Sequence, residues 1–508
     1  MPEIFKIGAA VIFVPIALLI SLTSVHMLQL SSYQTPSYWG WLRRSSRNYY
    51  SRYFFCALIA MLGLWESWIA WAAAAALSAG LWAILFIGRK PSKKPLKYTS
   101  RVIRLLTAQF ILIALCAWLI YALPHRFALV WMASAYLMIP FITMLSNFIT
   151  MPVQRMINRY YINGAKRILR ESPNLKIIGI TGSYGKTSMK FILTRLLSVK
   201  YETLMTPDSY NTTLGVVRTI RERLKPTHEV FVCEMGARHV GDIREICELV
   251  QPQQGILTSI GEQHLDTFKT TENVIKTKFE LIESISGTAF LNLDSSPVRE
   301  HARPKDCVTY ALENPADYTA DGLTVSSAGS TFTLNAPNGE KAVYTTSLLG
   351  RHAVLNIAGA AAAAHTMGIP LEKLTETIAR LPQVPHRLQL VKGGQFTIID
   401  DAFNANPAGV KAALETLAMF EGVKAVITPG MVELGARQDE LNREYGRQIA
   451  EVCDYAVLVG GKQTAAIKEG LGGFENVTVA DSFTEAMARV RELNPDVVLL
   501  ANDLPDNY

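Results

Sequence analysis

The segment Ile178-Gly-Ile-Thr-Gly-Ser-Tyr-Gly-Lys-Thr-Ser188 carries the clearest chemical signal in the chain. An apolar run enters a glycine-rich turn that ends in a lysine and two hydroxyl side chains, where a helix is expected to begin. Free backbone N–H groups, the positive end of a helix, an ammonium group and a hydroxyl together favour a nucleotide phosphate with its magnesium ion. The segment therefore predicts binding of ATP or GTP. A structural turn that carries a surface lysine is the alternative.

Three polar residues farther along the chain stand where apolar runs end or helices are expected. Glu234 follows the apolar run Val230-Phe-Val-Cys233, where a nucleotide enzyme places a carboxylate against the magnesium of its phosphate loop. His264 lies just past another apolar run, and Lys278 lies in Lys276-Thr-Lys-Phe-Glu280. The alternatives are a solvent-facing carboxylate, a structural histidine and a solvated lysine.

The short spacing Thr181-Gly-x-x-Gly-Lys-Thr187 has two residues, rather than the usual four, between its first glycine and Gly-Lys. It resembles the phosphate loop of the Mur ligase family, the ATP-dependent amide ligases that build the peptide stem of bacterial cell walls. The resemblance runs from about Lys176 to Lys462 and implies that ATP activates a carboxylate as an acyl phosphate. It also implies ATP contacts from Thr181, Gly182, Ser183, Tyr184, Gly185, Lys186, Thr187 and Ser188.

The same resemblance assigns the metal ligands. Thr187 and Glu234 match the ligands of one Mg²⁺ ion, and the segment Ile260-Gly-Glu-Gln-His-Leu-Asp266 makes His264 the ligand of a second. Lys278 matches a lysine that many of these enzymes carry as a carbamate, which turns a cation into an oxygen ligand. Lys276 is the competing register for that assignment.

Substrate contacts are also implied by motif. Asn211 and Thr212 lie in a segment similar to the substrate-side loop of the family. Asn356 closes Gly350-Arg-His-Ala-Val-Leu-Asn356, which resembles the segment near the nucleotide base, although Ala353 replaces the first asparagine of that pattern. Arg387 resembles the linker arginine that reaches the ATP phosphates.

The octet Asp400-Asp-Ala-Phe-Asn-Ala-Asn-Pro407 is the most specific match after the phosphate loop. It resembles the D-alanyl-D-alanine-adding, MurF-like branch, with Phe403 in place of the usual tyrosine, and Met431-Val-Glu-Leu-Gly435 points to the same branch. A strand end followed by a helix cap is the alternative interpretation. The resemblance makes Asn404 and Asn406 substrate contacts, and the predicted catalytic residues are Lys186, His264, Lys278 and Asp401.

The first 151 residues are the source of the high apolar fraction of this 508-residue chain. Ile7–Leu30, Thr107–Leu123 and Phe127–Met151 are each long enough to cross a bilayer. Tyr53–Gly88, with Glu66 as its one charge, is too long for one span and predicts two short spans turning near Glu66, or a re-entrant hairpin. We expect about five transmembrane helices, with Glu66 at the outer interface rather than acting as an intramembrane carboxylate.

Basic residues flank these segments, and membrane orientation and anionic lipid account for the net charge of +7 without nucleic acid. The same rule places the N-terminus outside and the nucleotide-binding part in the cytoplasm, so we expect a multi-pass protein of the cell membrane. The six cysteines form no C-x-x-C pair and are expected to be reduced.

Beyond residue 151, short apolar runs alternate with helical stretches, which is typical of α/β domains. We predict an α-helical membrane domain at 1–152, a central P-loop ATPase domain at 153–384 with a small antiparallel patch between Tyr318 and Leu349, and a Rossmann-like C-terminal domain at 385–508. The predicted strands are 176–181, 229–234, 255–259, 289–293, 396–400, 425–428, 456–459, 477–480 and 497–500.

The membrane segments stand where soluble Mur ligases carry a domain for the UDP end of their precursor. The leading interpretation is a membrane-anchored ligase joining a cell-wall peptide precursor to an amino acid or dipeptide. A ligase for a lipid-linked or other envelope polymer, similar to poly-γ-glutamate synthases, is the alternative within enzymes. An ATP-driven transporter or a nucleotide-sensing scaffold is the alternative from another class, although the candidate ligase residues favour an enzyme.

Overall fold

The structure is a computed structural model that describes residues 2–44, 50–65, 67–87, 95–208, 210–261, 265–302, 307–326, 329–383, 386–391, 394–402, 406–432, 434–461 and 464–502. The predicted residues Glu66, His264, Phe403 and Asn404 lie outside the described residues. The chain divides into an N-terminal helical unit that ends at Tyr160 and a second unit that begins at Tyr161.

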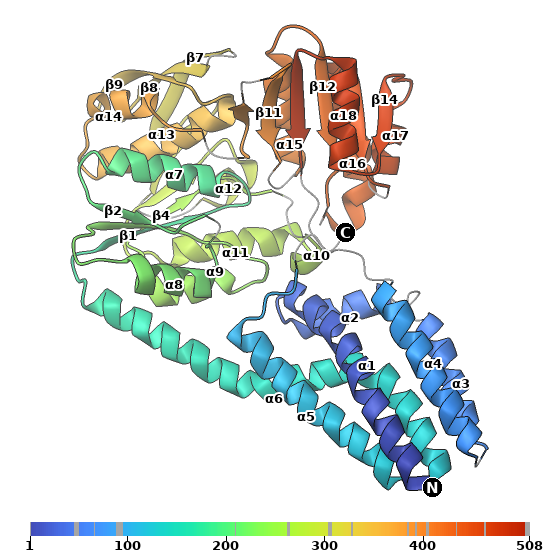
Figure 1. The fold of residues 1–508 in the computed structure, drawn as a ribbon. Coiled ribbons are helices and arrows are strands. Elements are labelled where there is room, and N and C mark those ends of the chain that lie inside the picture. Colours follow the sequence, from blue (N-terminus) through green and yellow to red (C-terminus); the bar gives the residue numbers. More distant parts are fainter. Residues whose placement is uncertain are drawn as a thin grey trace. The chain divides into compact units, whose positions relative to one another are not determined.

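The helical unit consists of α1 (Pro2–Leu30), α2 (Thr35–Arg44), α3 (Tyr50–Leu62), α4 (Trp68–Ile87), α5 (Ser100–Ala122) and the first part of α6 (His125–Arg170) (Figure 1). Its core is apolar, with Phe13, Ile59, Ile113 and Tyr136 packed together. Because hydrocarbon supplies no hydrogen-bond partners, helices are a suitable form for such apolar segments in a bilayer.

Among the described residues, three helical segments are long and apolar enough to cross a membrane: Glu3–Leu30, Ser100–Ala122 and Phe127–Arg170. Trp68–Ile84 is a shorter apolar helix. In the long stretch predicted to turn near Glu66, α3 ends at Leu62 and α4 begins at Trp68. That these helices span a membrane, and that they number about five, stays a prediction.

α6 is much longer than the apolar run that predicts it. It continues to Arg170 with Pro140 and Pro152 inside, so the predicted domain border at residue 152 falls within a helix. Past Met151 the sequence becomes amphipathic, and Ala165 packs with Leu175 and Ile220 of the second unit. The helix therefore extends because its last turns join the core of that unit.

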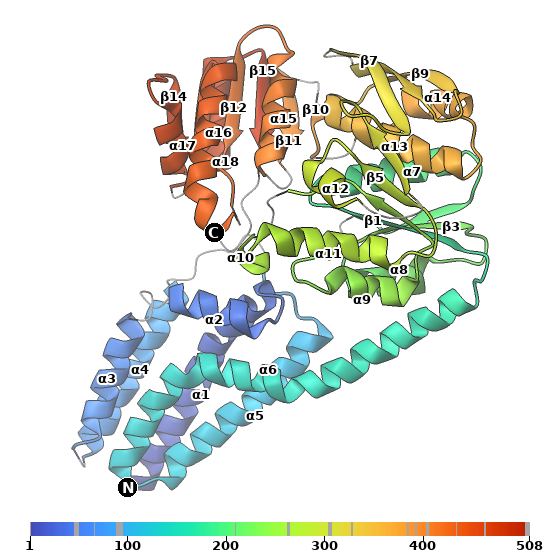
Figure 2. The same cartoon turned by 180° about the vertical axis from the view of Figure 1, so that it is seen from behind.

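The second unit begins with a nine-stranded sheet in the order β2-β3-β1-β4-β5-β6-β7-β8-β9. The first seven strands in this order run parallel, and β7, β8 and β9 form the antiparallel patch that the sequence predicts (Figure 2). The strands are β1 (Lys176–Thr181), β2 (Thr203–Met205), β3 (Val230–Glu234), β4 (Gln254–Leu257), β5 (Ala289–Asn292), β6 (Cys307–Ala311), β7 (Tyr318–Ser326), β8 (Gly329–Asn335) and β9 (Lys341–Thr346).

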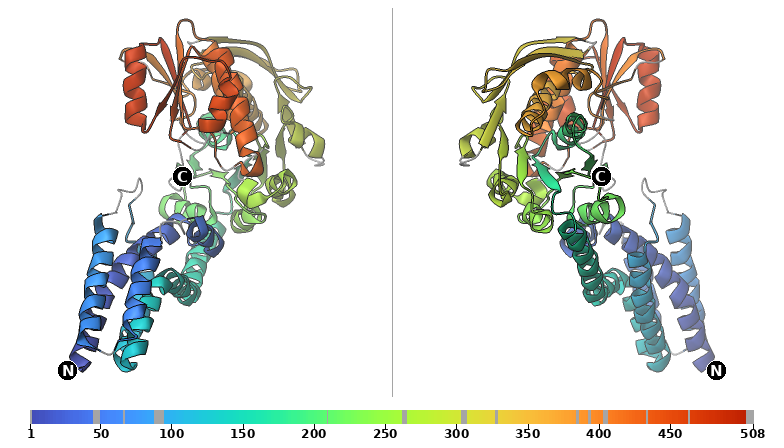
Figure 3. Two further views of the ribbon diagram at one scale, coloured as in Figure 1. Left: turned by 90° about the vertical axis from the view of Figure 1, so that its right-hand side faces the viewer. Right: turned by 90° about the vertical axis from the view of Figure 1, so that its left-hand side faces the viewer.

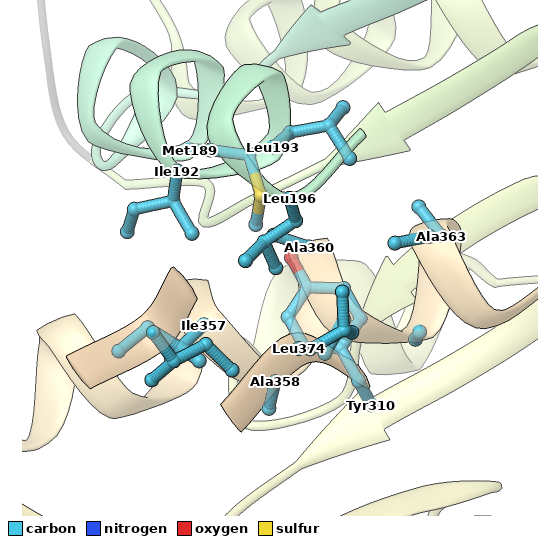
Figure 4. Packing of buried hydrophobic residues seen from close by; sticks show 14 of the residues in the cluster. Met189, Ile192, Leu193, Leu196, Tyr310, Ile357, Ala358, Ala360, Ala363 and Leu374 are labelled. Carbon is cyan, nitrogen blue, oxygen red and sulfur yellow. The ribbon is translucent and has the colours of Figure 1, made fainter. Parts of the chain in front are cut away.

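Helices cover both faces of this sheet. On one face, α7 (Lys186–Leu197) packs against the alanine-rich α13 (Arg351–Thr366) and α14 (Leu371–Ala379), as Figure 4 shows. On the other lie α8 (Thr213–Arg223), α9 (Asp242–Val250) and α11 (Thr271–Ser284). The short helices α10 (Leu265–Phe268) and α12 (Ser296–His301) complete this part of the chain. Because β1 is central, the loop that follows it opens at the carboxyl edge of the sheet, where α/β proteins bind ligands.

The last part of the chain, coloured orange to red in Figure 3, forms a sheet with helices packed on it. Its six strands lie in the order β10-β11-β15-β12-β13-β14. Its helices α15, α16 and α17 cover one face and α18 covers the other. The strands are β10 (Gln389–Val391), β11 (Thr397–Asp401), β12 (Lys424–Thr428), β13 (Tyr455–Val459), β14 (Val477–Ala480) and β15 (Val497–Ala501), and the helices are α15 (Pro407–Ala418), η2 (Gly435–Arg437), α16 (Gln438–Val452), α17 (Thr464–Leu471) and α18 (Phe483–Leu493). The predicted α/β fold class is confirmed.

Candidate active site

The glycine-rich turn lies between the end of β1 at Thr181 and the start of α7 at Lys186. Gly185 has φ of +80°, in the left-handed region that favours glycine. A Cβ at Gly182 would collide with Thr258 Oγ1, and one at Gly185 would lie 2.9 Å from Asn356 Oδ1. The loop therefore follows a path that requires glycine at both positions and brings Asn356 of α13 against it, while the predicted contact of Asn356 with ATP stays a prediction.

Lys186 folds back over this loop. Its Nζ donates to Gly182 O at 2.8 Å and to Ser183 O at 3.1 Å. Burial lowers the pKa of Lys186 to about 8, with Glu234 raising it and Arg387 lowering it. The ammonium group and the N-terminus of α7 fit a polyphosphate, because each contributes positive charge to one place. The N–H groups of Ser183 and Tyr184 in the loop donate to Ser259 O at 2.6 and 3.3 Å.

Glu234, at the end of β3, is the centre of a buried polar cluster. Its Oε1 accepts hydrogen bonds from Thr187 Oγ1 and from Asn211 Nδ2, both at 3.1 Å. Its Oε2 lies 2.9 Å from Lys190 Nζ, and both side chains of this ion pair are almost fully buried. The cluster therefore joins the phosphate loop, strand β3 and the predicted substrate-side loop through one carboxylate.

The ionisation of Glu234 is set by its neighbours. Burial raises its pKa, but the charges of Lys190 and Lys186 and the hydrogen bonds from Lys190 and Asn211 outweigh burial, so the pKa lies below its usual range. An ionised carboxylate beside the Thr187 hydroxyl offers the hard oxygen ligands that Mg²⁺ prefers. The described residues contain no group of three or more His, Cys, Asp or Glu side chains that could hold a metal. Of the predicted metal ligands, the structure brings together the Thr187 hydroxyl and the Glu234 carboxylate.

Lys190 is the functional candidate that the sequence reasoning missed. Besides pairing with Glu234, its Nζ donates to Asp208 O at 2.5 Å. It lies on α7 three residues before Leu193 and seven before Leu197, both fully buried, so helical spacing places it on the buried face. A lysine at an apolar position needs a charged partner, and that signal was available in the sequence.

Lys278 of α11 is buried, whereas Lys276 is exposed. Burial lowers the pKa of Lys278 well below its usual value, and Lys186 lowers it further against the opposing effects of Asp242 and Glu280. The structure thus separates the two registers by environment. Burial at Lys278 favours the neutral amine form that carbamate formation requires, whereas Lys276 is exposed to solvent.

The predicted substrate-side residues lie at the start of α8. Thr212 caps this helix by accepting a hydrogen bond from Gly215 N at 3.4 Å. The backbone of Asn211 accepts a hydrogen bond from Gly236 N at 2.7 Å, and a Cβ at Gly236 would lie 2.7 Å from Asn211 Oδ1. The glycine after Met235 therefore allows Asn211 to reach Glu234.

The C-terminal candidates lie around the end of β11. His386 Nδ1 is 2.8 Å from Asp400 Oδ2, and Asp401 Oδ1 accepts a hydrogen bond from Leu388 N at 3.2 Å. Burial lowers the pKa of Arg387, while Asp401 and Glu234 raise it. Asn406 is buried and caps α15 through a hydrogen bond from Gly409 N at 2.7 Å. Its cap role matches the alternative interpretation of the octet, and its substrate contact stays a prediction.

Asp401 gives an expected pH dependence. Burial raises its pKa to about 7, against the lowering effects of Arg387 and the Leu388 N–H. Between about pH 4 and 7 the folded chain holds a proton that the unfolded chain has lost, so stability falls as pH rises through this window. We expect Asp401→Asn to stabilise the protein by on the order of 2 kcal/mol at pH 8, a value kept small because Asp401 is only partly buried. At pH 4.5 the stabilisation should be much smaller, because the folded chain still holds the proton there. Urea unfolding at both pH values tests this, and an equal effect at both contradicts it.

Comparison with known proteins agrees with this geometry. Residues 180–364 match the Mur ligase middle domain, and residues 386–502 match the Mur ligase, glutamate ligase domain. The chain belongs to the Mur ligase family and is therefore an ATP-dependent ligase that forms an amide. Within the family it lies in the MurF-like branch.

The relatives of that branch match about two thirds of the chain. The UDP-N-acetylmuramoyl-tripeptide--D-alanyl-D-alanine ligase of Escherichia coli (strain K12) is 30% identical over 332 residues, which is 64% of this chain and 72% of the relative. The Mycobacterium tuberculosis (strain H37Rv) enzyme of that name is 33% identical over 360 residues, 64% of this chain and 70% of the relative.

Solved structures show the same relation. MurF from Acinetobacter baumannii has a TM-score of 0.63 at 26% identity and covers 68% of this chain and 78% of its own. MurF ligase from Thermotoga maritima, solved in complex with ADP, has a TM-score of 0.63 at 25% identity over 69% of this chain and 81% of its own. The predicted family and branch are confirmed.

Proposed function

We propose that this protein joins D-alanyl-D-alanine to the free carboxylate of a muramoyl-tripeptide precursor, using ATP, at the cytoplasmic face of the cell membrane. The observation that carries the proposal is the cluster around Glu234, because it connects the phosphate loop to the predicted substrate loop through Thr187 and Asn211. The names and similarity of the MurF-like relatives support this choice of substrates.

In the proposed reaction the acceptor carboxylate takes the γ-phosphoryl group of ATP, and the amine then displaces phosphate to form the amide. Lys186 and the N-terminus of α7 would hold the polyphosphate, and Thr187 and Glu234 would hold one Mg²⁺ ion. His264 and carbamylated Lys278 are the proposed ligands of a second ion. Bound magnesium would offset the negative charge of the transferred phosphoryl group. Catalysis therefore depends chiefly on positioning and electrostatics.

Asp401 is the proposed acceptor for the proton of the attacking amine. With its pKa raised to about 7, it is ionised in much of the population at neutral pH and is basic enough to take a proton. Arg387, whose charge lowers the pKa of Asp401, also supplies positive charge toward Lys186 and Glu234. Asn404 and Asn406 remain proposed contacts to the substrates.

The N-terminal unit supports the proposal that the protein resides in a membrane. Three of its helical segments have the length and composition to cross a bilayer. The family models begin only at residue 180, so the helical unit stands outside the part shared with Mur ligases. That observation favours a second candidate, in which the acceptor is a lipid-linked peptide or another envelope polymer. A non-catalytic scaffold is the alternative in which the site residues bind nucleotide without turnover.

The test is phosphate release by detergent-purified full-length protein given ATP, magnesium and D-alanyl-D-alanine. One arm supplies the UDP-linked muramoyl-tripeptide and the other its lipid-linked form. Release with the UDP form supports the leading proposal, and release only with the lipid form supports the second candidate. Silence in both arms, despite ATP binding, contradicts both and favours a scaffold or another substrate.

Lys186→Ala is the control with a defined expected effect. Because the ammonium group supplies charge where the phosphoryl group is transferred, we expect amine-dependent phosphate release to fall about 10²–10³-fold. Lys276→Ala, at an exposed lysine, should leave the rate within about twofold of wild type, in line with the small effect of a surface substitution. Equal losses in the two variants would remove Lys186 from the proposed role.

A further inference from the structure

The helical unit contains two half-buried arginines, Arg101 and Arg104, one turn apart at the start of α5. Neither forms an ion pair with a carboxylate among the described residues. Residues that are three apart on a helix lie on the same face, so the two guanidinium groups share one side of α5. Partly removing two like charges from water without a counter-ion is unfavourable, and the pair therefore has the character of an anion site.

Each arginine is held by a neutral group. The guanidinium of Arg101 lies 3.6 Å from the centre of the Tyr33 ring, which is a close cation–π contact. Arg104 Nη2 donates to Gln154 Oε1 at 2.6 Å, and Gln154 Nε2 in turn donates to Asn158 Oδ1 at 2.8 Å. These contacts orient both groups without neutralising them, so most of their N–H donors remain available to an anion.

The backbone around the pair is fixed from several elements. Ser32 and Tyr33 have φ of +53° and +61°, so two non-glycine residues adopt the left-handed conformation in the turn that places the Tyr33 ring. Asn147 Nδ2 of α6 donates to Tyr33 O at 3.3 Å. Gln29 at the end of α1 exchanges two hydrogen bonds with the backbone of Lys97, at 2.9 and 3.0 Å.

The N-terminal part of the chain is poor in carboxylates. Residues 1–160 contain fifteen lysines and arginines but only two carboxylates, Glu3 and Glu66. Glu3 lies at the start of the 29-residue α1, about 40 Å along the helix from the turn that holds Tyr33. Figure 1 shows α2 at the end of this unit away from the N-terminus. This end is therefore strongly positive.

The short helix α2 gives the same end the composition of a membrane interface. Tyr38 is buried against Val25, Val102 and Leu105, whereas Arg43 is exposed and lies over the Trp39 ring at 5.4 Å. Tryptophan and tyrosine concentrate at the level of the lipid headgroups, and arginine binds phosphate through two parallel hydrogen bonds. At the level of the lipid headgroups, we expect the anion that contacts Arg101 and Arg104 to be the phosphate group of a lipid.

We propose that Arg101 and Arg104 form a binding site for the phosphate of an anionic phospholipid in the leaflet on the side of α2. The proposal rests on the membrane residence proposed above, but it does not depend on which substrates the ligase unit uses. The site selects lipid by headgroup charge, because its donors are guanidinium groups and its supports are neutral. Loss of the site changes lipid selectivity rather than ligase chemistry.

The test uses full-length protein in a nonionic detergent, with thermal unfolding followed as dioctanoyl phosphatidylglycerol is added. Stabilisation of the wild type by this lipid, and not by dioctanoyl phosphatidylcholine, is the expected result. In Arg101→Gln/Arg104→Gln the half-saturating lipid concentration should rise at least tenfold. In Arg155→Gln/Arg159→Gln, which removes the same charge from exposed positions of α6, it should change by less than twofold.

Other outcomes overturn the proposal. Equal changes of the half-saturating lipid concentration in the two double variants would mean that lipid binding depends only on the overall positive charge. Stabilisation by inorganic phosphate at similar concentrations would identify a free anion as the ligand. If Arg101→Gln/Arg104→Gln does not accumulate in cells, Tyr33→Leu is the second variant, because it keeps both charges and removes the aromatic support. It should weaken the stabilisation by phosphatidylglycerol and leave the response to phosphatidylcholine unchanged. A protein that stays in the aqueous phase without detergent refutes membrane residence instead.

Discussion

Lys190→Met is expected to destabilise the ligase unit by about 3–5 kcal/mol, because it leaves the carboxylate of Glu234 buried without its cation. Lys190 and Glu234 are 2.9 Å apart, and neither side chain is more than 2% exposed. The substitution also removes the donor that holds Asp208 O. Since Glu234 then loses its fixed orientation toward Thr187, we expect amine-dependent phosphate release to fall about 100-fold, which is the size of effect seen when a positioning contact is lost. Urea unfolding and the phosphate assay measure the two effects.

A double variant separates the charge from the chemistry. Lys190→Met/Glu234→Gln removes both charges, so most of the lost stability should return, while activity stays low because Glu234 is the proposed magnesium ligand. Lys411→Met breaks an exposed pair with Glu415, whose atoms are 4.0 Å apart, and should cost less than about 0.5 kcal/mol. If Lys190→Met costs no more than this surface control, the buried pair does not organise the site.

The contrast between Glu234 and Lys190 shows what the sequence can predict about this site. A carboxylate at the end of an apolar strand, beside a glycine-rich loop, has few places to lie in a parallel sheet, so Glu234 was predictable. Lys190 is a charged residue in a helix, and residue type alone suggests a solvated position. Only its spacing from Leu193 and Leu197 indicates the buried face. The same spacing, from Val274 through Lys278 to Leu281, distinguishes Lys278 from Lys276.

The fold was predictable where apolar periodicity is strong and unpredictable where tertiary contacts decide. The central strands were found with ends shifted by one or two residues, but β2 and β10 have three residues each, too few for a periodic signal. β6 was also missed. The length of α6 depends on packing by Ala165. Asn406 caps α15 through the hydrogen bond from Gly409 N, and sequence alone does not separate this role from the substrate contact, which stays a prediction.

Lys278→Ala is expected to lower ligase activity about 10²-fold or more, and short carboxylic acids are expected to restore part of it. Lys278 is 3% exposed, and its Nζ has no hydrogen bond to another described residue. As an ammonium group it is repelled by Lys186, whereas a carbamate formed from CO₂ would be attracted to it. Addition of CO₂ to the neutral amine releases one proton and creates an anionic oxygen ligand, which a cation site favours electrostatically. The removed carboxylate can be replaced by a small acid in the space that the substitution leaves.

The measurements are activity and a direct signal for the carbamate. Wild-type activity should fall when CO₂ is removed from the buffer and should return with bicarbonate, and ¹³C-labelled bicarbonate should give one carbamate resonance that is absent from Lys278→Ala. Lys276→Ala, two residues away but exposed, should retain the resonance, the CO₂ dependence and the rate. A CO₂-independent wild type without the resonance would leave Lys278 as a buried amine, whose lowered pKa serves a different purpose in the site. A third outcome is that the wild type shows the resonance but no small acid restores activity to Lys278→Ala. That outcome would show that the position of the carbamate is required, and not only its charge.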